Sequence, residues 1–248
     1  MLKNKLRAGG VHLLISATVV AVVVVLAWRV WYPGYLSIAA GMLTMIGILA
    51  AVDIVLGPVC TFIVYRPGKQ SLRFDLAVIA GVQLLALAYG VHAIYVARPA
   101  YIVFAIDRFE VVSAAELEPR QLELASPEFR GLPRTGPLLV AARLPGDREE
   151  RNALLLSETL YGAGLSQMPR YYVAYREERE RGLAKSSSID QLEKFNDATA
   201  IERALAGIGR PRDTLRYFPM TAKDRDLSVI VDARSGNVLG VVDLRPWG

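Results

Sequence analysis

The sequence contains almost no cysteine or histidine. Its single cysteine is Cys60, and its two histidines, His12 and His92, lie inside apolar segments. One cysteine cannot form an intramolecular disulfide or a CxxC redox motif. No histidine or cysteine follows residue 100, so that region lacks Ser-His-Asp or Cys-His catalysis and the usual zinc sites. These scarcities indicate neither a metal nor a cofactor.

Acidic residues are scarce in the first part of the chain. Residues 1–99 contain eight basic residues and only two acidic ones, Asp53 and Asp75, which gives a formal charge of +6. The remaining 21 basic and 22 acidic residues give −1 for residues 100–248. The overall charge of +5 and the pI near 9.4 would first suggest a nucleic acid or a membrane surface as partner. The near neutrality of the second part argues against nucleic acid.

Long apolar runs are confined to the first part of the chain. Crossing a bilayer takes roughly 20 predominantly apolar residues, and residues 11–28, 36–65 and 76–97 meet this condition. We therefore predict three transmembrane α-helices over residues 1–99 and a separate domain over residues 100–248. Residues 28–32 are bulky where a small-residue cleavage site would lie, so the first segment is interpreted as an uncleaved anchor.

The basic residues predict an orientation. Lys3, Lys5 and Arg7 precede the first span, and Arg66, Lys69 and Arg73 lie between the second and the third. The positive-inside rule places both regions in the cytoplasm. The second part of the chain is then outside, in the periplasm of a Gram-negative cell, which makes the chain a multi-pass inner-membrane protein bounded by lipid.

Small and polar residues recur along the second and third spans. The second span carries Gly47, Ala50, Asp53, Gly57 and Thr61, and the third carries Gln83, Ala86, Gly90 and Ala93. Such spacing places residues on one side of a helix, and small residues let helices approach closely. One interpretation is that the two stripes pack against each other in a three-helix bundle. The other is that Asp53 faces a cleft that accepts another protein's helix or an ion, since carboxylates inside a membrane are costly and often functional.

Pro58 adds an irregularity beside Asp53. Its missing N–H leaves the carbonyl of Ile54 without a helical donor, so we expect a kink near Asp53. A proton-coupled transporter would need more than this one carboxylate, and the sequence shows no inverted repeats.

The second part of the chain predicts a small α+β domain. We expect one antiparallel sheet with helices on one face, from the alternation of strand and helix signals. The expected strands are residues 101–112, 138–142, 169–175, 227–233 and 238–244, the last two as a hairpin, and the expected helices begin at Ser113, Asp147 and Ser188. Tyr171, Tyr172 and Tyr175 are interpreted as core or rim rather than as a ligand site.

Enzymatic chemistry is not indicated in this domain. Lys185 adjoins three serines, but a Ser-Lys dyad needs geometry rather than adjacency, and serine clusters typically mark loops. Glu177, Glu178 and Glu180 lie in a charged run rather than in an apolar setting. The sequence is therefore interpreted as a non-enzyme.

An ordered set of motifs resembles a known family. The set comprises HLLIS from His12, WYPG from Trp31, VDIVLGP from Val52, KQSLRFDLAVI from Lys69, QLLALAYG from Gln83, ARPAY from Ala97 and FAIDRFE from Phe104. In this order the motifs resemble the TfpX/TfpZ (FimB-like) family of type IV pilin accessory proteins. The resemblance is dense over residues 10–112 and looser beyond, where residues 231–240 and 246–247 also fit.

The resemblance implies an inner-membrane chaperone or assembly factor that binds the major type IV pilin and promotes its stability or assembly. It brings no catalytic residues. A membrane-anchored periplasmic sensor that signals through a partner is the alternative, and a small transporter or a pilin-modifying enzyme is a third class. The candidate partner-binding residues are Gly47, Ala50, Asp53, Gly57, Pro58, Arg73, Asp75, Gln83, Gly90, Asp107 and Arg108.

Two of these groups have simpler interpretations. Arg73 can meet lipid headgroups while Asp75 favours the N-terminus of the third helix through the helix dipole, or both can contact another pilus assembly component in the cytoplasm. Asp107 and Arg108 are expected to form a surface ion pair at a sheet edge.

Overall fold

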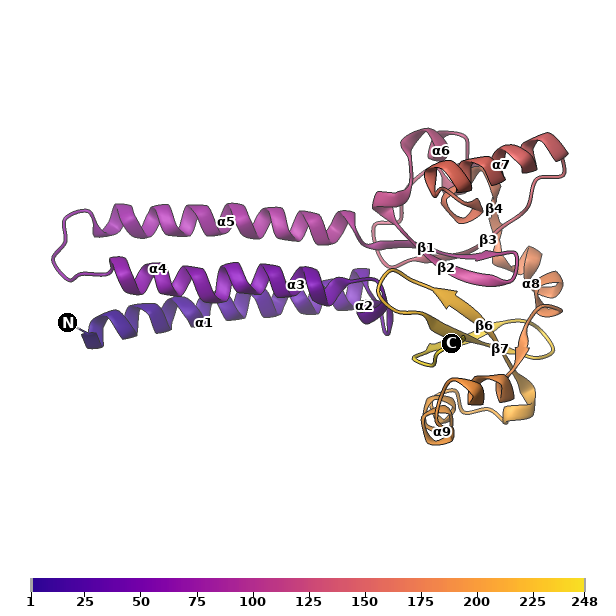
Figure 1. The fold of residues 1–248 in the computed structure, drawn as a ribbon. Helices are drawn as coiled ribbons and strands as arrows, with labels where there is room; N and C mark the ends of the chain where they lie inside the picture. Colours follow the sequence, from indigo (N-terminus) through magenta and orange to yellow (C-terminus); the bar gives the residue numbers. More distant parts are fainter. Residues whose placement is uncertain (1, 248) are drawn as a thin grey trace. The chain divides into compact units, whose positions relative to one another are not determined.

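The structure, a computed structural model that describes residues 2–247, divides into two compact units (Figure 1). The helical unit comprises Met1–Trp31 and Gly41–Ala97, and the sheet unit comprises Tyr32–Ala40 and Arg98–Gly248. Nine of the ten residues between the first two long helices, Tyr32–Ala40, thus belong to the sheet unit. Each unit is described by itself below.

Three long apolar helices form the helical unit. The first is α1 (Leu2–Leu26), extended by a π-helical turn over Ala27–Trp31. The second consists of α3 (Met42–Ala50), a π-helical segment over Ala51–Leu56, and α4 (Gly57–Val64). The third is α5 (Leu72–Val96). By length and composition, Leu2–Trp31, Met42–Val64 and Leu72–Val96 are each able to cross a membrane.

The second long helix begins later than its hydropathy indicates. We expected a span from residue 36, but Leu36–Ala39 forms the separate short helix α2 of the sheet unit. Gly41 then adopts φ = 80°, a left-handed conformation that interrupts the helix and is natural for glycine. An apolar run alone cannot show such a break.

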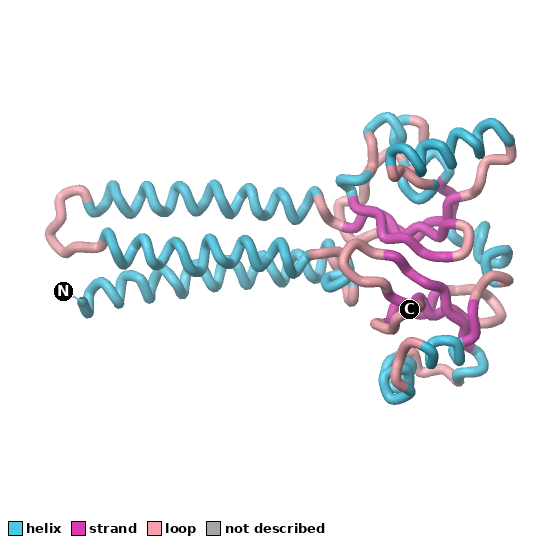
Figure 2. Tube along the Cα trace, in the orientation of Figure 1, coloured by secondary structure: helices cyan, strands magenta, loops and turns pink. Residues whose placement is uncertain are grey.

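The sheet unit is built on an eight-stranded sheet (Figure 2). The order is β4-β3-β1-β2-β6-β7-β8, and β5 pairs with β6. The bounds are β1 Pro99–Ala105, β2 Arg108–Ser113, β3 Leu138–Ala142, β4 Tyr172–Ala174, β5 Ser187–Ser188, β6 Leu215–Thr221, β7 Leu227–Asp232 and β8 Val238–Val242.

The expectation of a purely antiparallel sheet is wrong, because the sheet is mixed. The hairpins β1–β2 and β7–β8 are antiparallel, as short connections require. However, β1 pairs with β3 in parallel, and β2 pairs with β6 in parallel. Both parallel pairs join strands separated by long connections that contain other elements. The expected single strand over residues 101–112 is itself the β1–β2 hairpin, which reverses at Ile106 and Asp107.

Helices cover both faces of the sheet rather than one. The remaining helices are α6 Pro119–Glu123, α7 Arg148–Tyr161, α8 Tyr175–Leu183 and α9 Ala198–Ala206. Residues of β1 enter different clusters. Tyr101 and Val103 belong to the cluster that includes Leu154 of α7, whereas Phe104 belongs to the cluster that includes Tyr175 of α8. β1 therefore has a helix-covered core on each side.

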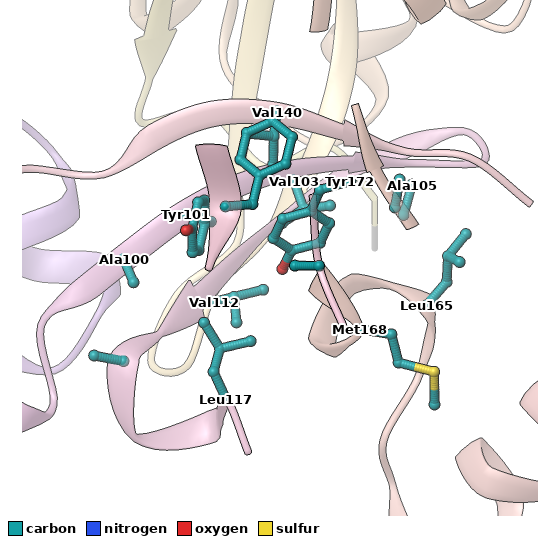
Figure 3. Packing of buried hydrophobic residues seen from close by; sticks show 14 of the residues in the cluster. Ala100, Tyr101, Val103, Ala105, Val112, Leu117, Val140, Leu165, Met168 and Tyr172 are labelled. Atoms are coloured by element: carbon teal, nitrogen blue, oxygen red, sulfur yellow. The ribbon is translucent and has the colours of Figure 1, made fainter. Parts of the chain in front are cut away.

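The first of these clusters shows how the core is assembled (Figure 3). The rings of Tyr101 and Tyr172 meet edge to face, with centroids 5.0 Å apart. Val103, Val140 and Met168 pack around them. Tyr172 is almost fully buried and Tyr175 nearly so, which confirms that these tyrosines belong to the core.

Several local predictions are confirmed at their capping residues. The Asp147 side chain accepts a hydrogen bond from the Glu150 N–H, and Gly162 ends α7 with φ = 67°. Ser113 and Glu116 form the expected capping box, although it opens a 3₁₀ turn rather than an α-helix. Ser188 likewise caps a 3₁₀ segment over Ile189–Lys194, and α9 begins only after a break at residues 195–197.

The segment before the second long helix is tied into the sheet unit. Leu36 and Ala39 of α2 are buried in the cluster that contains Phe104 and Phe218. The backbone N–H of Asp224 donates to the carbonyl of Ala39 at 2.8 Å. Sequence reasoning treated residues 29–35 as a short external loop, and nothing local in the sequence shows that the following residues join a sheet formed far downstream.

Candidate functional site: a polar groove in the helical unit

Asp53 lies midway along the second long helix, inside its π-helical segment. Its side chain is only 5% exposed. In a π-helix each carbonyl pairs with the N–H five residues on, so Pro58 removes the donor of Asp53 itself rather than that of Ile54. The side-chain amide of Gln83 on α5 instead donates to the Asp53 carbonyl, with Nε2 and O 3.2 Å apart. The irregularity expected near Asp53 is therefore a π-helical segment completed by a side chain of another helix.

The two stripes of small residues bring the second and third long helices together. A Cβ added to Gly57 would lie 1.9 Å from Nε2 of Gln83, and one added to Gly90 would lie 2.5 Å from Cδ1 of Leu49. The space beside each glycine is thus filled by a side chain of the neighbouring helix within the same chain. This supports the packing interpretation for most of the stripe.

Gly47 does not share the buried face of Asp53, Gly57 and Pro58. It is exposed, and a Cβ added there would meet no atom within 4 Å. Gly47 and Asp53 are separated by two three-residue steps. Together these steps rotate the position by about a third of a turn around an α-helix, so Gly47 faces away from Asp53. The expectation that Gly47 lies on the same face is wrong, while Ala50 is half-buried between them.

A groove runs between α1 and α5 and reaches Asp53. Its deeper part has a volume of about 190 Å³ and its wider part about 710 Å³. The two parts share His12, Ile15 and Ala80, so they form one continuous depression. The deeper part is lined by His12, Ile15, Ser16, Val19, Asp53, Ala80, Gln83, Leu84 and Leu87. We call this depression the α1–α5 groove.

Acceptor atoms without partners mark the floor of the α1–α5 groove. Within residues 2–247, Oδ2 of Asp53 and Oε1 of Gln83 are buried side-chain atoms that have no hydrogen-bond partner. Nearby, Nδ1 of His12 and Oγ1 of Thr61 are 2.6 Å apart and satisfy each other. A buried polar atom left unpaired costs free energy, so these two acceptors are unfavourable as they stand in the described chain.

Sequence reasoning identified Asp53 and Gln83 and offered a cleft beside Asp53 as one of two interpretations, but it did not include His12 or α1 in the lining. The stripe argument concerned only the second and third spans, whereas α1 forms one wall of the groove. A histidine inside an apolar segment was the available signal, because polar side chains at such positions typically have a partner on a neighbouring helix.

The other candidate residues are separate from the groove. Asp75 pairs with Lys69 at 2.5 Å and accepts from Oγ of Ser71 at 3.1 Å in the first turn of α5, while Arg73 is exposed. Asp107 and Arg108 form the expected ion pair at 2.9 Å. This pair lies at the β1–β2 turn rather than at an edge strand, and the Arg108 guanidinium also lies over the Trp247 ring.

The described part of the sheet unit offers structural rather than catalytic polar groups. No group of three His, Cys, Asp or Glu side chains that could hold a metal occurs among residues 2–247. The Ser186 hydroxyl donates to the Leu183 carbonyl and accepts from Arg216. Burial is the main cause that raises the pKa of Tyr175 to about 12, and the Tyr175 hydroxyl donates to the carbonyl of Gly236.

Three long apolar helices with a mainly apolar groove that reaches Asp53, joined to a mixed-sheet α+β unit, define a class of protein without a recognisable catalytic centre among its described residues. No solved structure matches the chain. Residues 1–35 match the family Fimbrial assembly protein FimB.

Curated relatives extend this match. One is "Fimbrial assembly protein, serogroup I" of Dichelobacter nodosus, 34% identical over 177 residues, which cover 71% of this chain and 68% of the relative. Another is "Fimbrial assembly protein, serogroup E1" of the same organism, 31% identical over 207 residues, which cover 80% of each chain. The chain belongs to the FimB family of fimbrial assembly proteins.

Proposed function

We propose that this protein is an inner-membrane accessory protein that binds type IV pilin and promotes its stability or its assembly into pili. Membership of the fimbrial assembly family carries this proposal, because two relatives that match over most of their length bear that name. The three apolar helices support it, since they suit a protein that works beside subunits held in a membrane.

The membrane arrangement is part of the proposal. The three long helices span the inner membrane, with the N-terminus and the loop before α5 in the cytoplasm, as their basic residues favour. Residues 1–99 form the membrane region and residues 100–248 the periplasmic domain. The α2 segment, which packs on the sheet, is then periplasmic as well.

Topology reporters test this arrangement. A periplasm-active phosphatase fused after residue 247 should be active, and the same enzyme inserted at Gly68 should be inactive. Gly68 suits the insertion because it is an exposed turn position with open space around it. Activity at Gly68 but not after residue 247 would overturn the orientation.

The proposed pilin contact is centred on Asp53 and Gln83. Gly57, Pro58 and Gly90 contribute by fixing how α3, α4 and α5 pack, and Gly47 and Ala50 extend the same helix. Arg73 with Asp75 is proposed as a contact with another pilus assembly component in the cytoplasm, and Asp107 with Arg108 as a secondary contact of the periplasmic domain. This assignment is supported by the unpaired acceptors on the groove floor.

Deletion of the gene, with complementation, tests the function. We expect the deletion strain to lose surface pili and to contain less pilin in its membranes, and the tagged protein to recover pilin. Complementation with Cys60→Ser serves as a matched control, because Cys60 is exposed on α4 and does not line the groove. Normal piliation of the deletion strain would contradict the proposal, and recovery of a signalling kinase without pilin would favour a membrane-anchored sensor.

A further inference from the structure

We propose that the α1–α5 groove holds one apolar transmembrane helix of the pilus subunit, and that this helix brings a hydrogen-bond donor to Asp53 and Gln83. The inference rests on the proposed function, because it takes the pilus subunit as the occupant. It adds the place of contact and the chemistry that recognises the partner.

The shape of the groove fits a helix rather than a compact ligand. It runs along α1 and α5 from Asn4 at one end to Leu87 at the other. Its walls are mainly apolar side chains such as Ile15, Val19 and Leu84. Helices associate inside a bilayer through close packing along their length and through a few interhelical hydrogen bonds. A groove between two parallel helix walls offers both.

The floor of the groove specifies what the occupant must carry. Oδ2 of Asp53 and Oε1 of Gln83 are both acceptors, and both lack a partner. Nε2 of Gln83 donates to the Asp53 carbonyl, and Nδ1 of His12 and the Thr61 hydroxyl lie 2.6 Å apart as a pair. Neither interaction gives Oδ2 of Asp53 a partner. The missing component is a donor: a hydroxyl, an amide N–H or an amine.

Charge complementarity selects among these donors. A carboxylate that faces an apolar groove is costly unless it is paired with a cation or accepts hydrogen bonds. The wider part of the groove is lined by Arg7 near its end. The part that contains Asp53 is lined by no lysine or arginine, and His12 is the one residue there whose side chain can carry a positive charge. An occupant helix with an amine or hydroxyl at the depth of Asp53 would satisfy the floor, and a helix without a donor would leave it unsatisfied.

Adjacent cysteines on α5 provide a matched test in the full-length chain in its own membranes. Leu84 lines the groove and Leu85 does not, although both side chains are largely exposed, at 65% and 74%. In a Cys60→Ser background, Leu84→Cys and Leu85→Cys would each be labelled with a thiol-linked photocrosslinker. Because the two positions are at almost the same depth, we expect a pilin adduct at Leu84→Cys and little or none at Leu85→Cys.

Asp53 variants then test the donor chemistry. In the Leu84→Cys background, Asp53→Leu should lower the pilin adduct about tenfold, the effect of losing one hydrogen bond to a charged group. Asp53→Asn keeps one acceptor in a side chain of the same size, so it should retain more of the adduct. The comparison of Leu84 with Leu85 needs no change at Asp53, so it holds even if Asp53→Leu fails to fold.

The outcomes separate this inference from the proposed function. Equal pilin adducts at the two cysteines, an adduct with lipid alone at Leu84→Cys, or an adduct unaffected by Asp53→Leu would overturn the groove proposal while pilin still co-purifies. Failure of the wild-type chain to recover pilin at all would instead overturn the proposed function.

Discussion

The side-chain amide of Gln83 on α5 donates a hydrogen bond to the backbone carbonyl of Asp53, with the two atoms 3.2 Å apart. Pro58 has no N–H to donate in the second helix, and this bond gives the Asp53 carbonyl a donor instead. It also holds Gln83 beside Asp53, with Oε1 directed to no partner. One contact therefore supplies a backbone hydrogen bond of the second helix and ties that helix to α5.

Replacing Gln83 with leucine should destabilise the helical unit. The change leaves the Asp53 carbonyl without its donor, and a buried unsatisfied acceptor costs about 1–3 kcal/mol. The purified full-length protein in detergent should therefore unfold at a lower temperature. Leu85→Ala, on the outward side of the same helix, is the control and should change the Tm little. Equal melting of Gln83→Leu and the wild-type protein would show that the bond carries no stability.

A second prediction concerns Gly182 of α8 in the sheet unit. A Cβ at this position would lie 2.6 Å from both Cε1 and Cζ of Phe104. The Phe104 ring is held by Phe109, Phe218 and Tyr175, so it has little room to move. Gly182→Ala should therefore destabilise the protein by about 1–3 kcal/mol, the usual effect of overpacking a core.

The control for that substitution is Gly146→Ala, because a Cβ there would meet no atom within 4 Å. Both variants gain the same methyl group, and Gly182 also lies inside a helix, where alanine is favoured over glycine by roughly 0.5–1 kcal/mol. A lower stability of Gly182→Ala than of Gly146→Ala therefore reports the contact with Phe104. Urea unfolding monitored by near-ultraviolet circular dichroism reports on the packed aromatic rings. Identical midpoints for the two variants would refute the close approach of α8 to β1.

The buried tyrosines predict a loss of stability at high pH. Burial raises the pKa of Tyr175 to about 12 in the folded protein, whereas an unfolded tyrosine has a pKa of about 10. A group whose pKa is raised by folding contributes its full stability below the unfolded value and loses it as the pH rises through the folded value. The contribution of Tyr175 should therefore disappear between about pH 10 and pH 12.

Tyr175→Phe isolates that contribution. The variant removes the hydroxyl that donates to Gly236 at 2.8 Å, so at neutral pH it should be about 1 kcal/mol less stable. The gap between the two proteins should narrow as the pH rises above about 10, because Tyr175 then ionises in the unfolded wild-type chain while it stays protonated in the folded one. Chemical unfolding at several pH values measures both effects, and a gap independent of pH would contradict the burial of this hydroxyl.

Local signals in the sequence predicted what depends on nearby residues. The helix from Asp147 to Gly162 was predicted at both ends, because a capping carboxylate and a terminal glycine act within one turn. The hairpin of β7 and β8 was predicted for a similar reason, since its turn residues set the reversal. In each case the determinants lie within a few residues of the element.

Long-range pairing was not predictable in this way. The strand β6 and its parallel pairing with β2 join residues about a hundred positions apart, and no local pattern encodes such a partner. The same holds for Leu36 and Ala39, which looked like the start of a span but pack on the sheet. Their apolar character suits a membrane and a protein core equally.

The candidate site was predictable in its residues but not in its shape. A carboxylate and an amide in apolar segments are costly enough to attract attention from sequence alone, which identified Asp53 and Gln83. Whether they are enclosed or open depends on where α1 lies relative to α5, and helical periodicity within one segment contains no such information.

The turn at Ile106 supports a prediction of increased stability. Ile106 has φ = 62°, and it is the one non-glycine residue with positive φ among the residues that the structure describes. The two residues that flank Ile106 close a tight turn, in which the Asp107 N–H donates to the Ala105 carbonyl at 2.7 Å. This conformation costs an L-residue roughly 1–2 kcal/mol. Burial of the Ile106 side chain offsets little of that cost, because the side chain is 49% exposed.

Ile106→Gly should therefore raise the Tm, because glycine adopts this conformation without steric strain. The gain should amount to about 1 kcal/mol, since the greater freedom of glycine in the unfolded chain offsets part of the relieved strain. Ile106→Ala is the matched control: it removes the same branched side chain but keeps the Cβ that clashes. Strain at the turn requires the glycine variant to be more stable than the alanine variant, so equal unfolding free energies would show that the turn is relaxed with isoleucine in place.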